Sequence, residues 1–83
     1  MTSLARTPKQ LGEAIRRYRQ LAKLNQAQLA AKAGLRQATV SDVESGTAAT
    51  RIETISKLLA ALDLELTIGP RSKGFNQDIE DIF

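Results

Sequence analysis

Apolar residues recur at helical spacing along most of the chain, and this pattern predicts four helices. The first helix would begin after Thr7, because a threonine cap followed by Pro8 and Gln10 has the chemistry of a helix start. We expect this helix to run to about Leu24. Its buried stripe would consist of Leu11, Ala14, Ile15, Tyr18 and Ala22.

Two short helices would follow, separated by a tight turn. Asn25 is a suitable cap for the second helix, and Gly34 is a natural left-handed stop for it. The third helix would occupy residues 37–45, bury Val40 and Val43, and end before a second glycine. Only residues 34–36 lie between the two helices, and a short turn with a glycine joins helices at a steep angle.

The hydrophobic pattern changes after a fourth helix. Thr50 and Glu53 form the signature of a capping box before this helix, whose buried face would consist of Ile52, Ile55, Leu58, Leu59 and Leu62. Residues 64–68 then alternate apolar with polar side chains and stop at Gly69 and Pro70, which predicts one short strand.

One strand in an otherwise helical chain cannot satisfy its own backbone hydrogen bonds. We therefore expect Leu64, Leu66 and Ile68 to mediate dimerisation, with two copies of the strand pairing antiparallel across a dimer axis. The predicted fold class is mostly α, with a domain of four to five helices and this one short C-terminal strand.

The length of 83 residues supports one compact domain, which we place at residues 7–69 between a flexible N-terminus, 1–6, and a mobile C-terminal tail, 70–83. The chain has no cysteine and no plausible set of metal ligands, so we expect no disulfide, no metal and no cofactor. Its first residues do not resemble a signal peptide, and no apolar run approaches the length of a membrane helix. These features predict a cytoplasmic protein without a membrane partner.

Charge is distributed unevenly along the chain. Residues 1–57 contain ten Lys or Arg against four acidic residues, whereas residues 58–83 contain two against five. A basic body with an acidic end fits a domain that binds a polyanion, followed by a segment for another partner. The alternative is an ordinary solvated surface charge without a binding role.

The most informative stretch runs from residue 24 through Gly34 to Gly46. Its small, polar and glycine positions agree over more than twenty residues with the repressor-type helix-turn-helix, and the chain resembles the Cro and phage-repressor family, also called the xenobiotic-response-element family. The resemblance covers residues 7–62 and implies a lambda-repressor-like fold whose third helix recognises double-stranded DNA. The small Ala30 would lie where two helices cross closely, and Val40 would fix the third helix against the others.

The outward face of the third helix would contact base edges. Arginine can form a bidentate contact with guanine, glutamine can do so with adenine, and an alanine methyl can meet the methyl group of thymine. Asp42 either accepts a hydrogen bond from a cytosine amino group or lies aside from the groove. The predicted base-contacting residues are Arg36, Gln37, Ala38, Ser41 and Asp42.

Other residues would contact phosphates. Gln26 begins the second helix, where exposed backbone N–H groups favour an anion, and the resemblance also implies that Gln26 braces Gln37. Thr39 and Ser41 have hydroxyls that can donate to phosphates, and residues at the start of the fourth helix would clamp a neighbouring phosphate. The predicted phosphate contacts are Gln26, Thr39, Thr50 and Arg51.

Glu44 has a structural role in the prediction. In the family that the chain resembles, an acidic residue at this position commonly pairs with a basic residue of the first helix. Three arginines, Arg16, Arg17 and Arg19, are open as its partner.

A narrower resemblance is to the HipB-type antitoxins. It rests on residues 36–41, on the strand after the fourth helix and on a tail that ends in an aromatic residue. The resemblance implies a homodimer that binds operator DNA and also binds a HipA-type serine/threonine kinase toxin. Three apolar residues of the acidic tail are the predicted toxin contacts: Ile79, Ile82 and Phe83. A frayed terminus without a role is the alternative for this tail.

Three other classes of function compete with an antitoxin that represses its own operon. An enzyme is not expected, since the chain has no His or Cys, no Gly-rich phosphate loop and no assembled carboxylate site. A phage-type or metabolic repressor without a toxin would use the same third helix but would not need the tail. A helical protein-interaction module would show little of the salt dependence that phosphate contacts confer.

Overall fold

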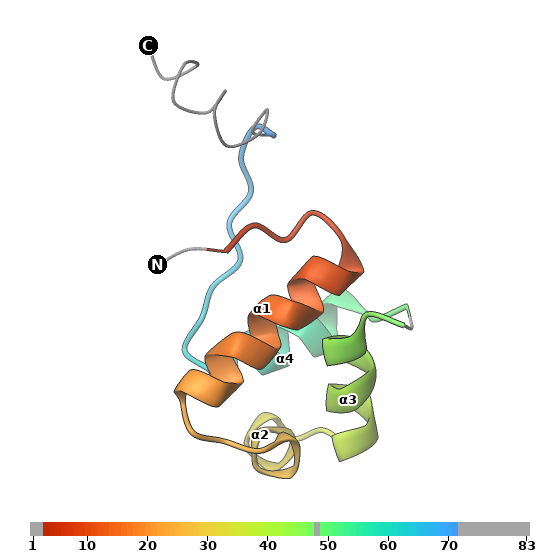
Figure 1. The fold of residues 1–83 in the computed structure, drawn as a ribbon, viewed down its shortest axis with the longest axis vertical. Helices are drawn as coiled ribbons and strands as arrows, with labels where there is room; N and C mark the ends of the chain where they lie inside the picture. The colour runs from red at the N-terminus through yellow and green to blue at the C-terminus, as the bar shows by residue number, and fades with distance from the viewer. Residues whose placement is uncertain (1–2, 48, 72–83) are drawn as a thin grey trace.

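The computed structural model describes residues 3–47 and 49–71, which form four helices joined by short connections. In chain order these are α1 (Pro8–Leu21), α2 (Gln26–Ala33), α3 (Gln37–Ser45) and α4 (Ile52–Ala61). Helix α1 packs on α3, and α2 packs on both α3 and α4 (Figure 1). The predicted helical domain is confirmed with four helices.

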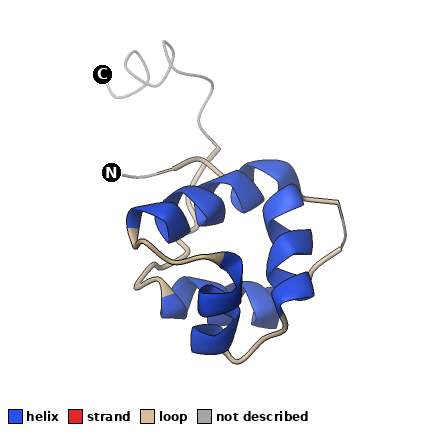
Figure 2. Cartoon of the chain, turned by 60° about the horizontal axis from the view of Figure 1, so that its bottom comes forward, coloured by secondary structure: helices blue, strands red, loops and turns tan. Residues whose placement is uncertain are grey.

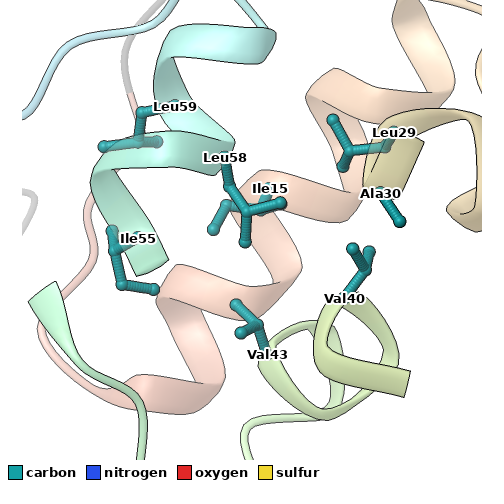
Figure 3. Packing of buried hydrophobic residues seen from close by; sticks show 8 residues of the cluster. All are labelled: Ile15, Leu29, Ala30, Val40, Val43, Ile55, Leu58 and Leu59. Atoms are coloured by element: carbon teal, nitrogen blue, oxygen red, sulfur yellow. The ribbon is translucent and has the colours of Figure 1, made fainter. Parts of the chain in front are cut away.

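All four helices contribute to one hydrophobic core (Figure 3). Val40 of α3 is fully buried, as predicted, and it lies near Ala30 of α2. Because interiors are packed as densely as organic crystals, these contacts fix how α3 is oriented on the rest of the domain. The core consists of Ile15, Leu29, Ala30, Val40, Val43, Ile55, Leu58 and Leu59.

The first two helices begin as the sequence predicts. The Thr7 side chain accepts a hydrogen bond of 3.1 Å from the Gln10 backbone N–H, and Gln10 Oε1 accepts one of 2.7 Å from the Arg6 N–H. At α2, Asn25 and Gln28 form a complete capping box, with bonds of 2.7 and 2.8 Å. These caps satisfy backbone donors that the first turn of a helix leaves without a partner.

Helix α1 ends at Leu21, three residues before the predicted Leu24. Lys23 adopts a left-handed conformation with φ of 60°, and the Leu24 N–H donates to the Arg19 carbonyl at 3.1 Å. This closure turns the chain toward α2. Ala22, predicted to be part of the buried stripe, is instead the exposed C-cap of α1.

The predicted capping box of α4 is wrong by one residue. The N-cap is Arg51, which makes no side-chain cap hydrogen bond, so Glu53 stands at the second helical position instead of the third. From there Glu53 pairs with Lys57 one turn later, with Oε1 3.6 Å from Nζ. Ile52 was predicted to be buried, but at the first position of the helix it is 67% exposed.

The predicted strand at residues 64–68 is not formed in the described single chain (Figure 2). After the Leu64 N–H donates to the Leu59 carbonyl at 2.7 Å, residues 65–71 make no backbone hydrogen bond with another described residue. A strand is defined by its ladder to a neighbour, and one copy of the chain offers no neighbour here. The tail beyond residue 71 lies outside the described residues.

Candidate nucleic-acid interface

Helix α3 divides cleanly into a buried face and an exposed face. Val40, Val43 and Glu44 are buried against the other helices. The solvent-exposed side is polar and includes the five predicted base-contacting residues, with Arg36 at the N-cap and Gln37, Ala38, Ser41 and Asp42 within the helix. Helix α3 and its N-cap therefore offer guanidinium, amide, hydroxyl, methyl and carboxylate groups on one exposed surface.

Two glycines set how closely α3 approaches α1. A Cβ at Gly12 would clash with the Val43 carbonyl oxygen and would lie 2.6 Å from the Glu44 carbonyl oxygen. At the other end of the contact, Gly46 has φ of 68°, and a Cβ there would lie 2.6 Å from Lys9 Cα. Backbone atoms on both sides leave no room for a side chain, so these glycines fix the depth at which the C-terminal half of α3 is seated.

Gly12 was missed as a functional position by sequence reasoning. The available signal was an isolated glycine inside a helical pattern, which usually has a packing reason because glycine weakens a helix interior by roughly 1 kcal/mol relative to alanine. Here the reason is the close approach of the α3 backbone.

A buried ion pair joins α1 to α3 and resolves the choice among three arginines. Arg19 donates from Nε to Glu44 Oε2 at 2.6 Å and from Nη2 to Glu44 Oε1 at 3.0 Å. The two residues are only 9% and 7% exposed, whereas Arg16 and Arg17 are exposed. The predicted structural role of Glu44 is thus seen in a bidentate pair, the geometry that makes carboxylate–arginine contacts strong.

The same arginine also fixes the connection between α1 and α2. Arg19 Nη1 donates to the Leu24 carbonyl oxygen at 2.8 Å. Because one guanidinium holds both this turn and α3, the orientation of α3 is tied to the start of α2.

Gln26 extends this network in a way that the sequence did not predict. Its Nε2 donates to Glu44 Oε1 at 3.2 Å, so the carboxylate receives three N–H groups. No hydrogen bond to Gln37 is found among the described residues, and the predicted brace is therefore not seen. The half-buried Gln26 side chain is held against the C-terminal part of α3 instead of its beginning.

The other predicted phosphate ligands lie on two elements. Thr39 is half-buried on α3, and Thr50 and Arg51 precede α4. At the end of α3, the Ser45 and Thr47 hydroxyls lie 2.8 Å apart, and Ser45 Oγ also donates to the Asp42 carbonyl oxygen at 3.0 Å. This hydroxyl pair at the end of α3 was not predicted.

The predicted dimerisation residues differ in exposure. Leu64 is half-buried and packs against the core, while Leu66 and Ile68 are exposed. The predicted toxin contacts Ile79, Ile82 and Phe83 lie outside the described residues.

Residues 3–47 and 49–71 hold neither a membrane-spanning helix nor a cluster of metal ligands. None of their helices combines the length and the apolar character needed to cross a membrane. They also contain no group of three His, Cys, Asp or Glu side chains placed to hold a metal ion.

The sequence is similar to known helix-turn-helix proteins. A family model described as helix-turn-helix matches residues 15–68. Antitoxin HipB of Escherichia coli strain K12 is 37% identical over 62 residues, which span 75% of this chain and 70% of the relative. Neither similarity indicates a catalytic family.

Solved structures share the fold as well. A HipB variant in an O2 20mer complex has a TM-score of 0.77 and 34% identity, covering 84% of this chain and 97% of that chain. The HipA–HipB–O2–O3 complex matches with a TM-score of 0.75 and 33% identity over 83% of this chain and 97% of that chain. A restriction-modification controller protein from Aeromonas hydrophila has a TM-score of 0.67 and 34% identity, with coverages of 70% and 84%. The chain therefore belongs to the helix-turn-helix family of Cro and phage-repressor type, within which it is a HipB-like antitoxin.

Proposed function

We propose that the protein is an antitoxin and transcriptional autorepressor in the cytoplasm. It binds operator DNA as a homodimer, and it binds and neutralises a HipA-type serine/threonine kinase toxin. The observation that carries the DNA-binding part is the exposed polar face of α3, which is held in one orientation by the buried Arg19–Glu44 pair.

In this proposal the exposed face of α3 enters the major groove. The bidentate chemistry of Arg36 and Gln37 suits guanine and adenine, and Ala38 suits the thymine methyl. Asp42 selects a cytosine amino group, because a carboxylate next to phosphates is otherwise unfavourable. Since the helix is seated by backbone contacts and an ion pair, it needs little reordering when it binds DNA.

Phosphate contacts would come from the elements that flank α3. Asn25 uses the Gln28 and Leu29 N–H groups, so the Gln26 and Ala27 N–H groups have no acceptor among the described residues. They are available to a phosphate at the positive end of α2, and Gln26 itself is anchored next to that position by Glu44. Thr39, Thr50 and Arg51 would complete the phosphate contacts.

The experiment for this part is selection from a pool of genomic fragments, followed by titration of the selected fragment against random DNA. We expect one fragment to be preferred, with an affinity that falls roughly tenfold or more when a moderate salt concentration is doubled. If no fragment were selected over bulk competitor in low salt, the DNA-binding proposal would be wrong.

Dimerisation in this proposal uses residues 64–68. Their backbone groups lack partners among the described residues, and an antiparallel second copy satisfies them. Leu66→Asp should abolish dimerisation and weaken operator binding without unfolding the domain, because the Leu66 side chain is already exposed. Unchanged dimerisation of this variant in light scattering would remove the role of the segment.

Toxin binding is supported by the likeness to a HipB chain that was solved in a HipA–HipB complex. The tail residues Ile79, Ile82 and Phe83 are the proposed contacts. Deletion of residues 71–83 should leave DNA binding intact and remove a copurifying kinase. If the kinase still copurified with the shortened protein, the tail would not be its binding site.

A repressor without a toxin is the second candidate. The similarity to a restriction-modification controller protein favours it, because that protein has the same fold and is not named as an antitoxin. The two candidates differ in one observation. A kinase gene immediately downstream, and its product in a pull-down, are expected only for the antitoxin.

A further inference from the structure

Arg16 is an exposed cation of α1 that the contacts described so far do not use. Its guanidinium forms no ion pair and no hydrogen bond with another described residue. On the surface of α1 it is the neighbour of Gly12, four positions earlier, and of Arg19, three positions later. Gly12 and Arg19 both contact α3, so Arg16 lies on the side of α1 that borders α3.

The side of Arg19 on which Arg16 emerges follows from burial. Two residues precede Arg19 by about one turn and are therefore its neighbours on the helix surface. Ile15, four positions earlier, is fully buried in the core, whereas Arg16, three positions earlier, is exposed. Arg16 therefore lies on the outer side of Arg19, away from the core.

Helix α3 has the same arrangement around the acid that Arg19 binds. Val40, four positions before Glu44, is fully buried, and Ser41, three positions before it, is exposed. The Arg19–Glu44 pair thus separates the core from an outer surface. Arg16 and Ser41 both lie on that outer surface. Since Ser41 is a predicted base contact, the surface leads from the exposed side of α3 onto α1.

We propose that Arg16 binds a phosphate of the DNA backbone at the edge of the major groove that α3 enters. This contact rests on the proposed function and extends its DNA interface to α1. Packed helices have axes about 8–10 Å apart and the major groove is about 12 Å wide, so a helix beside α3 lies over the groove's edge. Phosphates line that edge, and a guanidinium can bind one of them through two parallel N–H groups.

The charges near Arg16 are mixed, and they sharpen the expectation. Lys9 is exposed two turns earlier, and its backbone lies against Gly46 at the end of α3, so a second cation borders the same surface. Glu13, three positions before Arg16, is exposed and forms no ion pair with another described residue. An acid beside a phosphate opposes binding, so Glu13→Gln should tighten binding to operator and random DNA alike by about twofold.

Arg16→Ala tests the contact, and Arg17→Ala is its matched control. Arg17 is also exposed, but successive residues of a helix point about 100° apart, and this turns Arg17 away from α3. Arg16→Ala should weaken binding to operator and random DNA by roughly fivefold or more in low salt, and should lower the slope of log affinity against log salt by about 0.9 for each protomer bound. Arg17→Ala should weaken binding by about twofold or less. Equal losses would show that Arg16 acts only through net charge.

Ethylation interference and stability distinguish a phosphate contact from a structural role. Ethylation of one phosphate in each half-site should block the wild-type protein but not Arg16→Ala, and Arg16→Lys should retain most of the affinity because the charge remains. Arg16→Ala and Arg17→Ala should be equally stable in urea. A loss of stability in Arg16→Ala alone, with an unchanged ethylation pattern, would show that Arg16 stabilises the C-terminal end of α3 and does not bind phosphate.

The outcomes also separate this contact from the proposed function. If the wild-type protein selects no DNA fragment, the proposed function fails and the contact fails with it. If the wild-type protein selects a fragment and Arg16→Ala keeps the wild-type affinity and salt dependence, only the contact on α1 is wrong.

Discussion

Helix α3 and the segment after α4 differ in where they find their partners. Helix α3 is positioned by contacts within one chain. Its backbone lies against Gly12 of α1, its C-cap Gly46 lies against Lys9, and its Glu44 accepts three N–H groups from Arg19 and Gln26. Residues 65–71 have no backbone hydrogen bonds with other described residues, and the apolar Leu66 and Ile68 there are exposed.

The difference indicates how the two tasks of a repressor divide. The side chains that would contact bases are positioned by contacts within one chain, so a monomer should already expose them in the same orientation. In the proposed dimer, the spacing between two such helices is set by the second copy, which pairs with the segment after α4. Mutations on the α3 side should therefore alter stability or base preference, and mutations in the segment should alter assembly.

The largest expected effect comes from breaking the buried pair. Glu44→Ala leaves the Arg19 charge largely buried without its partner, so we expect the free energy of unfolding to fall by roughly 3 kcal/mol. Urea denaturation of the free protein measures this change.

The exposed pair of Glu53 and Lys57 is the matched control for that variant. With side chains that are 75% and 49% exposed, it should contribute no more than about 0.5 kcal/mol, so Glu53→Ala should be nearly neutral. Equal losses for Glu44→Ala and Glu53→Ala would show that the buried pair does not hold α3 in place.

The next largest effect is expected at Gly12. Gly12→Ala places a methyl group against two carbonyl oxygens of α3, and we expect a loss of about 2 kcal/mol in spite of the better helix propensity of alanine. Gly34→Ala should cost about 1 kcal/mol through its positive φ alone, since no atom lies within 4 Å of the added Cβ. A Gly12→Ala variant as stable as the wild-type protein would contradict the close seating of α3.

Base recognition gives an effect of similar or smaller size, measured on DNA. Arg36→Ala and Gln37→Ala should each weaken binding to the selected operator by about 1–3 kcal/mol and relax base preference at one position. Random DNA is the control. If affinity for random DNA fell by the same factor, these two residues would contact only phosphates.

The smallest expected effect is at Arg51. Arg51→Ala should weaken binding to operator and random DNA by the same modest factor, because a phosphate contact carries no sequence information. It should also reduce the slope of log affinity against log salt by about 0.9 for each protomer bound. An unchanged slope would remove Arg51 from the phosphate contacts.

The helices and the division of α3 were predictable from sequence because local chemistry fixes them. Asn25 and Gln28 signal the start of α2, Gly34 signals its end, and the spacing of Val40 and Val43 identifies the buried side of α3. Each of these signals depends on neighbours within one or two turns.

Other features depend on contacts that local patterns do not encode. The choice of Arg19 over Arg16 and Arg17 follows from the crossing of α1 on α3, and the Gln26–Glu44 bond joins residues that are 18 positions apart. The start of α4 was predicted one residue early, since the box signature of Thr50 and Glu53 is only a local preference. The predicted strand is absent from the described single chain, because its alternating pattern is local but a ladder needs a neighbouring strand.

The most direct test of the central claim is methylation interference on a selected operator, because it maps contacts in the major groove base by base. A dimer that inserts two copies of α3 should give two patches of interference in the major groove, one helical turn or roughly 34 Å apart. Arg36→Ala should lose guanine contacts within each patch. A single patch, or interference confined to the minor groove, would contradict the account.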